Sequence, residues 1–191
     1  MKVVVPSNPY DAKGLMAAAI DSDDPVIYIF HKGVMGLGWM AKNPRSIGAV
    51  PEEEYAVPIG KARVAREGVD VTIVTISLSV HHSLDVAEKL AGEGIDVEVI
   101  DLRSLVPLDR EAIVRSVGKT GRLIVVDEDY QSFGLSGEVI AAVVERDPGL
   151  LKRVSRVCVP DVPIPYAREL EHAVLPTPAR IEAAVREAMA T

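Results

Sequence analysis

The sequence contains one cysteine, few aromatic residues and no block of lysine and arginine. A lone Cys158 cannot form an internal disulfide, which is typical of proteins that fold in a reducing compartment. Only 4% of the residues are aromatic, so the core must be built from Val, Ile, Leu and Ala. A formal net charge of −7 argues against a surface for nucleic acid or anionic membrane. We therefore expect neither nucleic acid nor membrane as a partner.

Targeting and membrane-spanning segments are also missing from the sequence. Pro6, Pro9 and Asp11 interrupt the N-terminus too early for the apolar region of a signal peptide. The longest apolar runs fall far short of the roughly 20 residues that a membrane span needs. The 191 residues, 48% of them apolar, suit one domain or one domain plus a fragment of another. We expect a soluble, cytoplasmic protein.

The first part of the chain has the pattern of one βαβ unit. Residues 3–5 and 26–30 are strand-like and flank apolar residues at helical spacing. Ser7 and Asp11 are the expected N-cap residues of that helix. From Lys32 to Pro58 no periodicity survives, and glycine and proline recur. Long irregular segments of this kind are usually functional loops or linkers, so we place a domain boundary here.

After Gly60, strands and helices alternate. The expected strands are 71–76, 97–100, 123–126 and 154–159, and the expected helices lie within 84–91, 112–117, 134–145 and 181–189. Strands that are apolar throughout and alternate with helices indicate a mostly parallel sheet covered on both faces. Right-handed crossovers then make this an α/β fold with a doubly wound sheet.

Ligands of such sheets gather at the carboxyl ends of the strands. The polar segments expected there are 77–83, 101–105 and 127–130. His81 and His82 suggest a metal, but adjacent helical residues point apart and chelate one ion poorly, so a capping histidine with a local hydrogen bond is favoured. The clustered carboxylates of residues 127–129 could form an acid/base pair. A solvated strand end that caps the following helix is the favoured alternative.

The remaining polar candidates have simpler interpretations. Gly134–Gly137 resembles a phosphate-binding turn only loosely and is interpreted as a helix start. Asp101 and Arg103 straddle Leu102 and could pair across the strand end or reach a partner, and a surface salt bridge of little energetic weight is the favoured interpretation. Cys158, within an apolar strand, is interpreted as a small core residue. Taken alone, these segments predict no catalytic residue and no cofactor-binding residue.

Several segments resemble landmarks of the β-type subunit of thiamine diphosphate-dependent 2-oxo acid dehydrogenases, the E1 component, and of the transketolase C-terminal domain superfamily. They occur in family order: 6–15 (PSNPYDAKGL), 57–62, 70–75, 98–109 (EVIDLRSLVPLD), 121–127 and 160–167 (PDVPIPYA). The resemblance implies that residues 1–45 are the tail of a pyrimidine-binding domain. Residues 46–57 would be a linker, and residues 58–191 a transketolase C-terminal-like domain that serves subunit assembly.

The same resemblance implies an activity that this chain cannot carry out alone. The complete enzyme would decarboxylate a 2-oxo acid and transfer the acyl unit, using thiamine diphosphate and magnesium. The family's cofactor-binding glutamate and assisting histidine would precede Met1, and the diphosphate motif belongs to the α-type subunit. The implied partners are an α-type subunit or a pyrimidine-domain polypeptide, a lipoyl acyltransferase (E2) core, and a second copy in a homodimer.

One implied ligand set falls within the chain. Residues 19–25 resemble a turn that holds potassium through main-chain oxygens, and the matching residues are Ala19, Ile20, Ser22 and Asp24. A capped helix end is the alternative interpretation of this turn.

Departures from the family pattern leave the function open. They lie at residues 33–42, 78–79 and 130–132. A split transketolase-like enzyme that works without lipoamide and a non-catalytic docking module therefore remain alternatives. Residues 33–50, with the only tryptophan, Trp39, are expected to be mobile without a partner.

Overall fold

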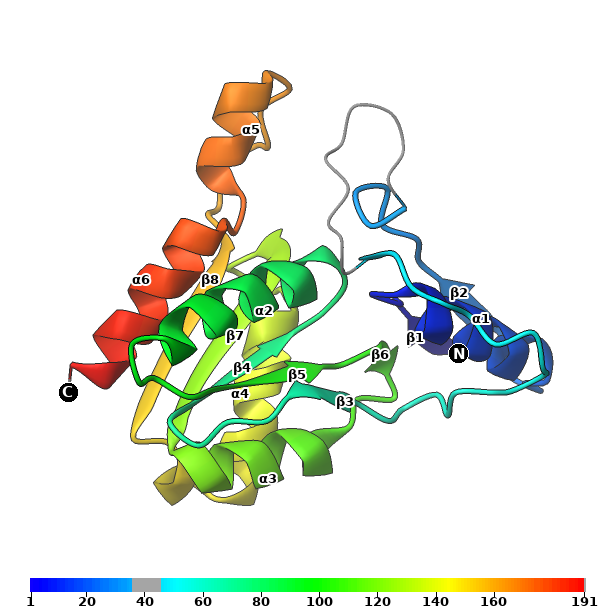
Figure 1. Ribbon diagram of the computed structural model, residues 1–191, viewed down its shortest axis with the longest axis horizontal. Helices are drawn as coiled ribbons and strands as arrows, with labels where there is room; N and C mark the ends of the chain where they lie inside the picture. Colours follow the sequence, from blue (N-terminus) through cyan, green and yellow to red (C-terminus); the bar gives the residue numbers. More distant parts are fainter. Residues whose placement is uncertain (36–45, 191) are drawn as a thin grey trace.

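The computed structural model describes residues 1–35 and 46–190, which form two β-sheets (Figure 1). The strands are β1 Lys2–Val4, β2 Val26–Tyr28, β3 Arg63–Arg66, β4 Val71–Thr75, β5 Val97–Asp101, β6 Ser104–Val106, β7 Arg122–Tyr130 and β8 Arg153–Val159. The helices are α1 Pro9–Ile20, α2 Leu78–Ala91, α3 Arg110–Thr120, α4 Leu135–Arg146, α5 Arg168–Val174 and α6 Pro178–Met189. A 3-10 turn, η2, spans Pro148–Leu150. Trp39 lies outside the described residues, so the expected mobility around it stays a prediction.

The main sheet has the strand order β3-β5-β4-β7-β8. The pairs β5–β4, β4–β7 and β7–β8 are parallel, and only the edge strand β3 runs antiparallel. This confirms the expected α/β fold with a mostly parallel, doubly wound sheet. The chain places β5 on one side of β4 and then β7 on the other, so the sheet reverses its winding between β4 and β7.

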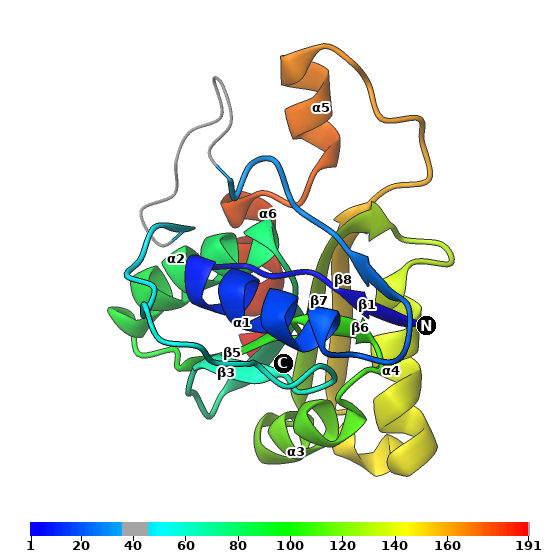
Figure 2. The same ribbon diagram turned by 90° about the vertical axis from the view of Figure 1, so that its right-hand side faces the viewer.

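Helices cover both faces of the main sheet (Figures 1 and 2). On one face, Ile73 and Val126 pack with Leu90 of α2 and Ile181 of α6. On the other face, Ile100, Leu123 and Val125 pack with Ile113 of α3 and Val143 of α4. β4 and β5 are buried along their whole length, as their β-branched sequences predict. Each fully buried aliphatic side chain contributes about 1.5–3 kcal/mol relative to exposure, so these two layers stabilise most of the fold.

The expected βαβ unit at the N-terminus is confirmed, but its helix cap differs. Asn8 is the N-cap of α1, and its Oδ1 accepts a hydrogen bond from the Asp11 amide at 2.9 Å. Ser7 and Asp11 do not cap the helix because both side chains contact the main domain instead.

The N-terminal strands join a second sheet with the order β2-β1-β6. β2 pairs with β1 in parallel, whereas β6, which follows the main-sheet strand β5, pairs with β1 antiparallel. Neither β6, β3 nor α5 was predicted, since each spans only three to seven residues. In the described part of the chain, no helix has the length and apolarity that a membrane span requires.

Candidate functional site

The three polar segments expected at the carboxyl ends of the strands do lie at that edge of the main sheet. Residues 1–35, called the N-terminal unit below, contact all three of them. Figure 1 shows β1 and α1 beside the ends of β5 and β6. The edge where this class of sheet usually binds ligands is therefore covered, at least in part, by the chain's own first residues.

Ser7 makes the first contact across this joint. Its hydroxyl donates a hydrogen bond of 2.5 Å to Asp101 Oδ2, and its carbonyl oxygen lies 2.6 Å from His81 Nε2. His81 is therefore not the local capping residue that was expected, because its partner is 74 positions earlier in the chain. Burial is the main cause that lowers the pKa of His81, so the imidazole is neutral at pH 7 and donates through Nε2.

Four charged side chains form the second contact. Arg103 Nε lies 3.3 Å and Arg63 Nε 3.6 Å from Asp11 Oδ2, and Arg63 Nη2 lies 3.2 Å from Asp101 Oδ2. Both carboxylates are buried, with 1% of Asp11 and none of Asp101 exposed. The expected surface pair between Asp101 and Arg103 is therefore wrong. Arg103 takes a positive φ of 58°, and its side chain pairs with Asp11, while its amide donates to Asp101.

His31 and Glu128 make the third contact. His31 Nε2 lies 2.9 Å from Glu128 Oε2, and the Gly33 amide donates to His31 Nδ1 at 3.0 Å. The hydrogen bond with Glu128 is the main cause that raises the pKa of His31. Glu128 thus anchors the N-terminal unit and does not form an acid/base pair with its neighbours.

Asp127 directly precedes Glu128 in β7 and is 6% exposed. Its Oδ1 accepts a hydrogen bond from the Asp129 amide at 3.2 Å, and its Oδ2 has no hydrogen-bond partner among the described residues. The expected capping of α4 by these carboxylates is wrong, since Gly134 occupies the N-cap position without a side-chain cap. The expected helix start at Gly134 is confirmed.

Replacing Asp127 with asparagine should stabilise the fold at neutral pH. Burial raises the pKa of Asp127 to about 6, above the ordinary value of about 3.9 in the unfolded chain. The folded state therefore loses relative stability as the pH rises from about 4 to 6, and the carboxylate remains a cost above that range. We expect Asp127→Asn to raise the free energy of unfolding by about 1–2 kcal/mol at pH 7 and to change nothing near pH 3. Urea titrations at both pH values test this, with Asp23→Asn, at an exposed site after α1, as control.

The other candidate residues have structural surroundings. Cys158 is 1% exposed in β8, and burial raises the pKa of its thiol, which confirms it as a core residue. Across the described residues, no group of three or more His, Cys, Asp or Glu side chains is placed to hold a metal. At the predicted potassium turn, Lys2 Nζ lies 2.9 Å from Ser22 Oγ and 3.2 Å from Asp24 Oδ2. The side chains of Ser22 and Asp24 thus pair with Lys2, and the Ala19 carbonyl oxygen accepts a hydrogen bond from the Ser22 amide at 3.3 Å.

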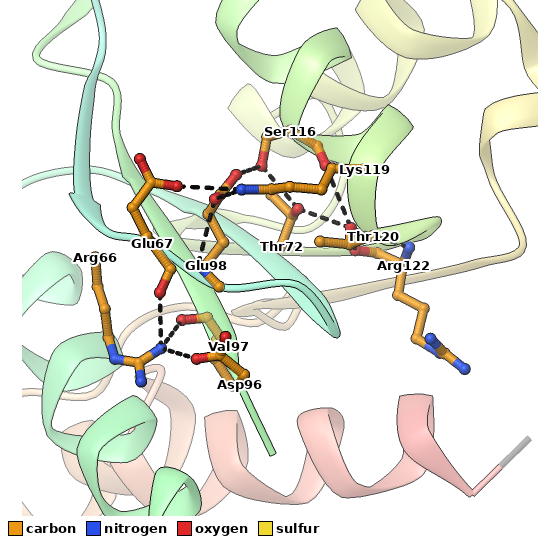
Figure 3. A network of polar contacts seen from close by, with 11 residues as sticks. Arg66, Glu67, Thr72, Asp96, Val97, Glu98, Ser116, Lys119, Thr120 and Arg122 are labelled. Carbon is orange, nitrogen blue, oxygen red and sulfur yellow. Dashed lines mark hydrogen bonds and ion pairs between the residues drawn. The ribbon is translucent and has the colours of Figure 1, made fainter. Parts of the chain in front are cut away.

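Sequence reasoning missed a network around Glu98, at the opposite edge of the sheet (Figure 3). Glu98 of β5 is 2% exposed and accepts hydrogen bonds from Ser116 and Lys119 of α3. Thr72 of β4 extends the network through contacts of 2.8 Å to Ser116 and to Thr120. A carboxylate inside an otherwise apolar strand was the available signal, because buried charges are normally paired. Since the network lies at the amino ends of the strands, we assign it a structural role.

These features define an α/β domain whose carboxyl edge carries a polar joint to its own N-terminal unit. The family model described as "Transketolase, C-terminal domain" matches residues 60–181. The chain therefore belongs to this family.

Similar proteins confirm the resemblance to E1 β-type subunits. The chain is 44% identical over 190 residues to the beta subunit of acetoin:2,6-dichlorophenolindophenol oxidoreductase from Cupriavidus necator, covering 99% of this chain and 54% of that protein. It is 42% identical to the beta subunit of 2-oxoisovalerate dehydrogenase from Bacillus subtilis, covering 98% of this chain and 55% of that protein. The chain spans about half the length of the curated relatives it matches.

A solved structure of a split-gene transketolase, described as an inactive beta4 tetramer, is also similar. It superposes with a TM-score of 0.80 at 29% identity, covering 100% of this chain and 58% of that chain. A transketolase from Leishmania mexicana superposes with a TM-score of 0.63 at 17% identity, covering 99% of this chain and 25% of that chain, which supports the fold alone.

Proposed function

We propose that this chain is the assembly part of a β-type subunit in an enzyme that decarboxylates a 2-oxo acid and transfers the acyl unit. Thiamine diphosphate and magnesium would serve the complete enzyme, with their ligands supplied by an α-type subunit or a pyrimidine-domain polypeptide. Residues 1–45 would be the tail of the pyrimidine-binding domain, 46–57 the linker and 58–191 the assembly domain. The same proposal includes a homodimer, an E2 core as a partner, potassium at the turn of residues 19–25 and a cytoplasmic location.

The uncovered face of the small sheet is the observation that carries this proposal. α1 and the segment before β3 pack on one face, where Val4, Leu15 and Val57 form a buried cluster. The other face carries Val3 between its register partners Ile27 and Val106, which are 45% and 46% exposed. Apolar side chains that gather on one exposed face often mark a contact with another protein, so a further layer of protein is proposed to cover this face. A complementary pyrimidine-domain polypeptide would supply it.

The polar joint explains how a docked partner would be held. The ion pairs of Asp11 with Arg63 and Arg103 fix the small sheet against the main domain. A protein layer that packs on Ile27 and Val106 would therefore have a fixed position relative to the small sheet and to the main domain. Co-expression with an α-type or pyrimidine-domain polypeptide tests the proposal. We expect co-purification of the wild type and at least tenfold weaker capture by Ile27→Lys, with Val69→Lys, exposed on the main domain, as matched control. Equal capture of both variants would contradict it.

The isolated chain should not bind the cofactor. In the proposed division of labour the cofactor ligands come from another polypeptide, and the N-terminal unit already contacts Asp101 and Arg103 at the carboxyl edge. We expect calorimetric titration with thiamine diphosphate and magnesium to give only heats of dilution. A micromolar isotherm from the chain alone would contradict the proposed division of labour between subunits.

A split transketolase-like subunit is the second candidate. The solved split-gene transketolase covers the whole of this chain with a TM-score of 0.80, which favours a ketol or acyl transfer without lipoamide. Activity of the reconstituted complex towards lipoamide or towards a sugar phosphate acceptor separates the two candidates. A third candidate, a docking module without catalysis, would give a stable complex that is inactive in both assays.

A further inference from the structure

A groove of about 590 Å³ lies between α3 and α4, on the face of the main sheet opposite to α2 and α6 (Figure 1). Val114 and Ala142 give it an apolar lining. Its charged lining comes from both helices: Arg110, Glu111 and Arg115 of α3, and Glu145 and Arg146 of α4. All five charged residues are exposed, so the groove is open to solvent. An open groove between helices suits a peptide segment, whereas a small-molecule site encloses most of its ligand.

Two arginines of this groove have no interaction partner among the described residues. Arg110 pairs with Glu138 and with Glu145, at 2.5 Å from each. Arg115 and Arg146 form no hydrogen bond or ion pair with the described part of the chain. Every other described arginine has a partner there. The two unpartnered guanidinium groups therefore lie in the same groove, one from each helix.

The charge of the groove is opposite to that of the whole chain. Because Arg110 is paired with Glu145, the two unpartnered arginines face a single unpartnered carboxylate, that of Glu111. Glu111 lies four residues before Arg115, which is the spacing of a helical ion pair, yet the two side chains do not pair in the structure. The chain has a formal net charge of −7, so most of its surface repels an acidic ligand, whereas this groove attracts one.

We propose that the α3–α4 groove is a docking site for an acidic peptide segment of another polypeptide, with Arg115 and Arg146 binding its carboxylates. Arginine contacts a carboxylate through two parallel hydrogen bonds, which gives such a contact geometric specificity. Val114 and Ala142 would contact apolar side chains of the same segment. The inference does not rest on the proposed function, because the protein layer proposed there packs on the small sheet and not on α3 or α4.

Fluorescence anisotropy with a labelled acidic peptide tests the proposal on the whole chain. The probe is a decapeptide of glutamate, leucine and serine, and its control is the same peptide with glutamine in place of glutamate. We expect a dissociation constant on the order of 100 µM for the acidic peptide and no binding of the control. Raising the ionic strength from about 0.05 M to about 0.5 M should weaken binding about fivefold or more, since the contact is ionic.

Substitution of the two unpartnered arginines should weaken this binding. We expect Arg115→Gln and Arg146→Gln each to raise the dissociation constant about threefold, and the double variant about tenfold. Both side chains lack partners in the described chain, so the melting temperature should stay the same. Arg186→Gln removes the same charge from α6, on the opposite face of the sheet, and should leave the dissociation constant unchanged.

Glu111→Gln should act in the opposite direction. It removes the carboxylate that competes with the peptide for Arg115, so binding should tighten about twofold or more. A wild-type chain that does not bind the acidic peptide at about 1 mM, roughly ten times the expected dissociation constant, would overturn the proposal. Binding that the double arginine variant leaves unchanged would overturn it equally. Displacement of the probe by inorganic phosphate as readily as by unlabelled peptide would show a simple anion site, and peptide docking would then be wrong.

Discussion

Asp11→Asn is expected to release the N-terminal unit from the main domain. The variant leaves the guanidinium groups of Arg103 and Arg63 without the carboxylate that lies 3.3 and 3.6 Å from them. Breaking a buried ion pair from one side typically costs 3–5 kcal/mol, and partial exposure of both arginines reduces this to about 2–4 kcal/mol. The loss should fall on the joint, because the layers on both faces of the main sheet do not include Asp11.

Hydrogen exchange resolves where that loss occurs. We expect amides of α1 and β2 to exchange at least tenfold faster in Asp11→Asn, while those of β4 keep their wild-type protection. Asp24→Asn removes the same charge from an exposed pair with Lys2 and should change neither region. Uniformly faster exchange in β4 as well would show that the N-terminal unit and the main domain unfold together, contrary to this description.

The elements of the main domain could be predicted because their signals are local. Val71–Thr75 is a β-branched run buried along its whole length, and α2 ends at Gly92 as its sequence indicates. β6 could not be predicted in the same way. Its three residues acquire strand geometry from pairing with β1, which lies about a hundred positions earlier in the chain. Long-range pairing of short segments leaves little periodicity to detect.

The location of polar side chains was predicted better than their partners. The carboxyl edge does gather Asp101, His81 and Glu128, as strand order and helix direction require. Their partners Ser7 and His31 come from the N-terminal unit, and nothing local in sequence links residues so far apart. Ser7 was assigned to a helix cap for this reason, since its Asp101 partner is 94 positions away.

Removing the cation beside Glu98 should have the other large effect. Burial favours the neutral carboxyl, but hydrogen bonds from Lys119 and Ser116 outweigh it and hold the pKa of Glu98 below its ordinary value. Glu98 therefore contributes stability that is present above about pH 4.3, the ordinary pKa of Glu, and is lost as the pH falls through the lower folded-state pKa. In Lys119→Met, burial remains without the ammonium group, and the pKa of Glu98 should rise instead.

This reversal of the pKa shift predicts a reversed pH dependence as well as a lower stability. We expect Lys119→Met to lose about 2–3 kcal/mol of unfolding free energy at pH 7, less than a fully buried pair because Lys119 is 38% exposed. Relative to the wild type at each pH, the stability of Lys119→Met should fall between pH 4 and pH 7. Lys61→Met, at an exposed site, should change neither quantity, and Lys119→Arg should restore most of the loss.

Adding Glu98→Gln to Lys119→Met removes the uncompensated charge, so the double variant should recover stability at pH 7. A double variant weaker than Lys119→Met at pH 7 would mean that packing of the lysine chain on α3, and not its charge beside Glu98, holds this edge of the sheet.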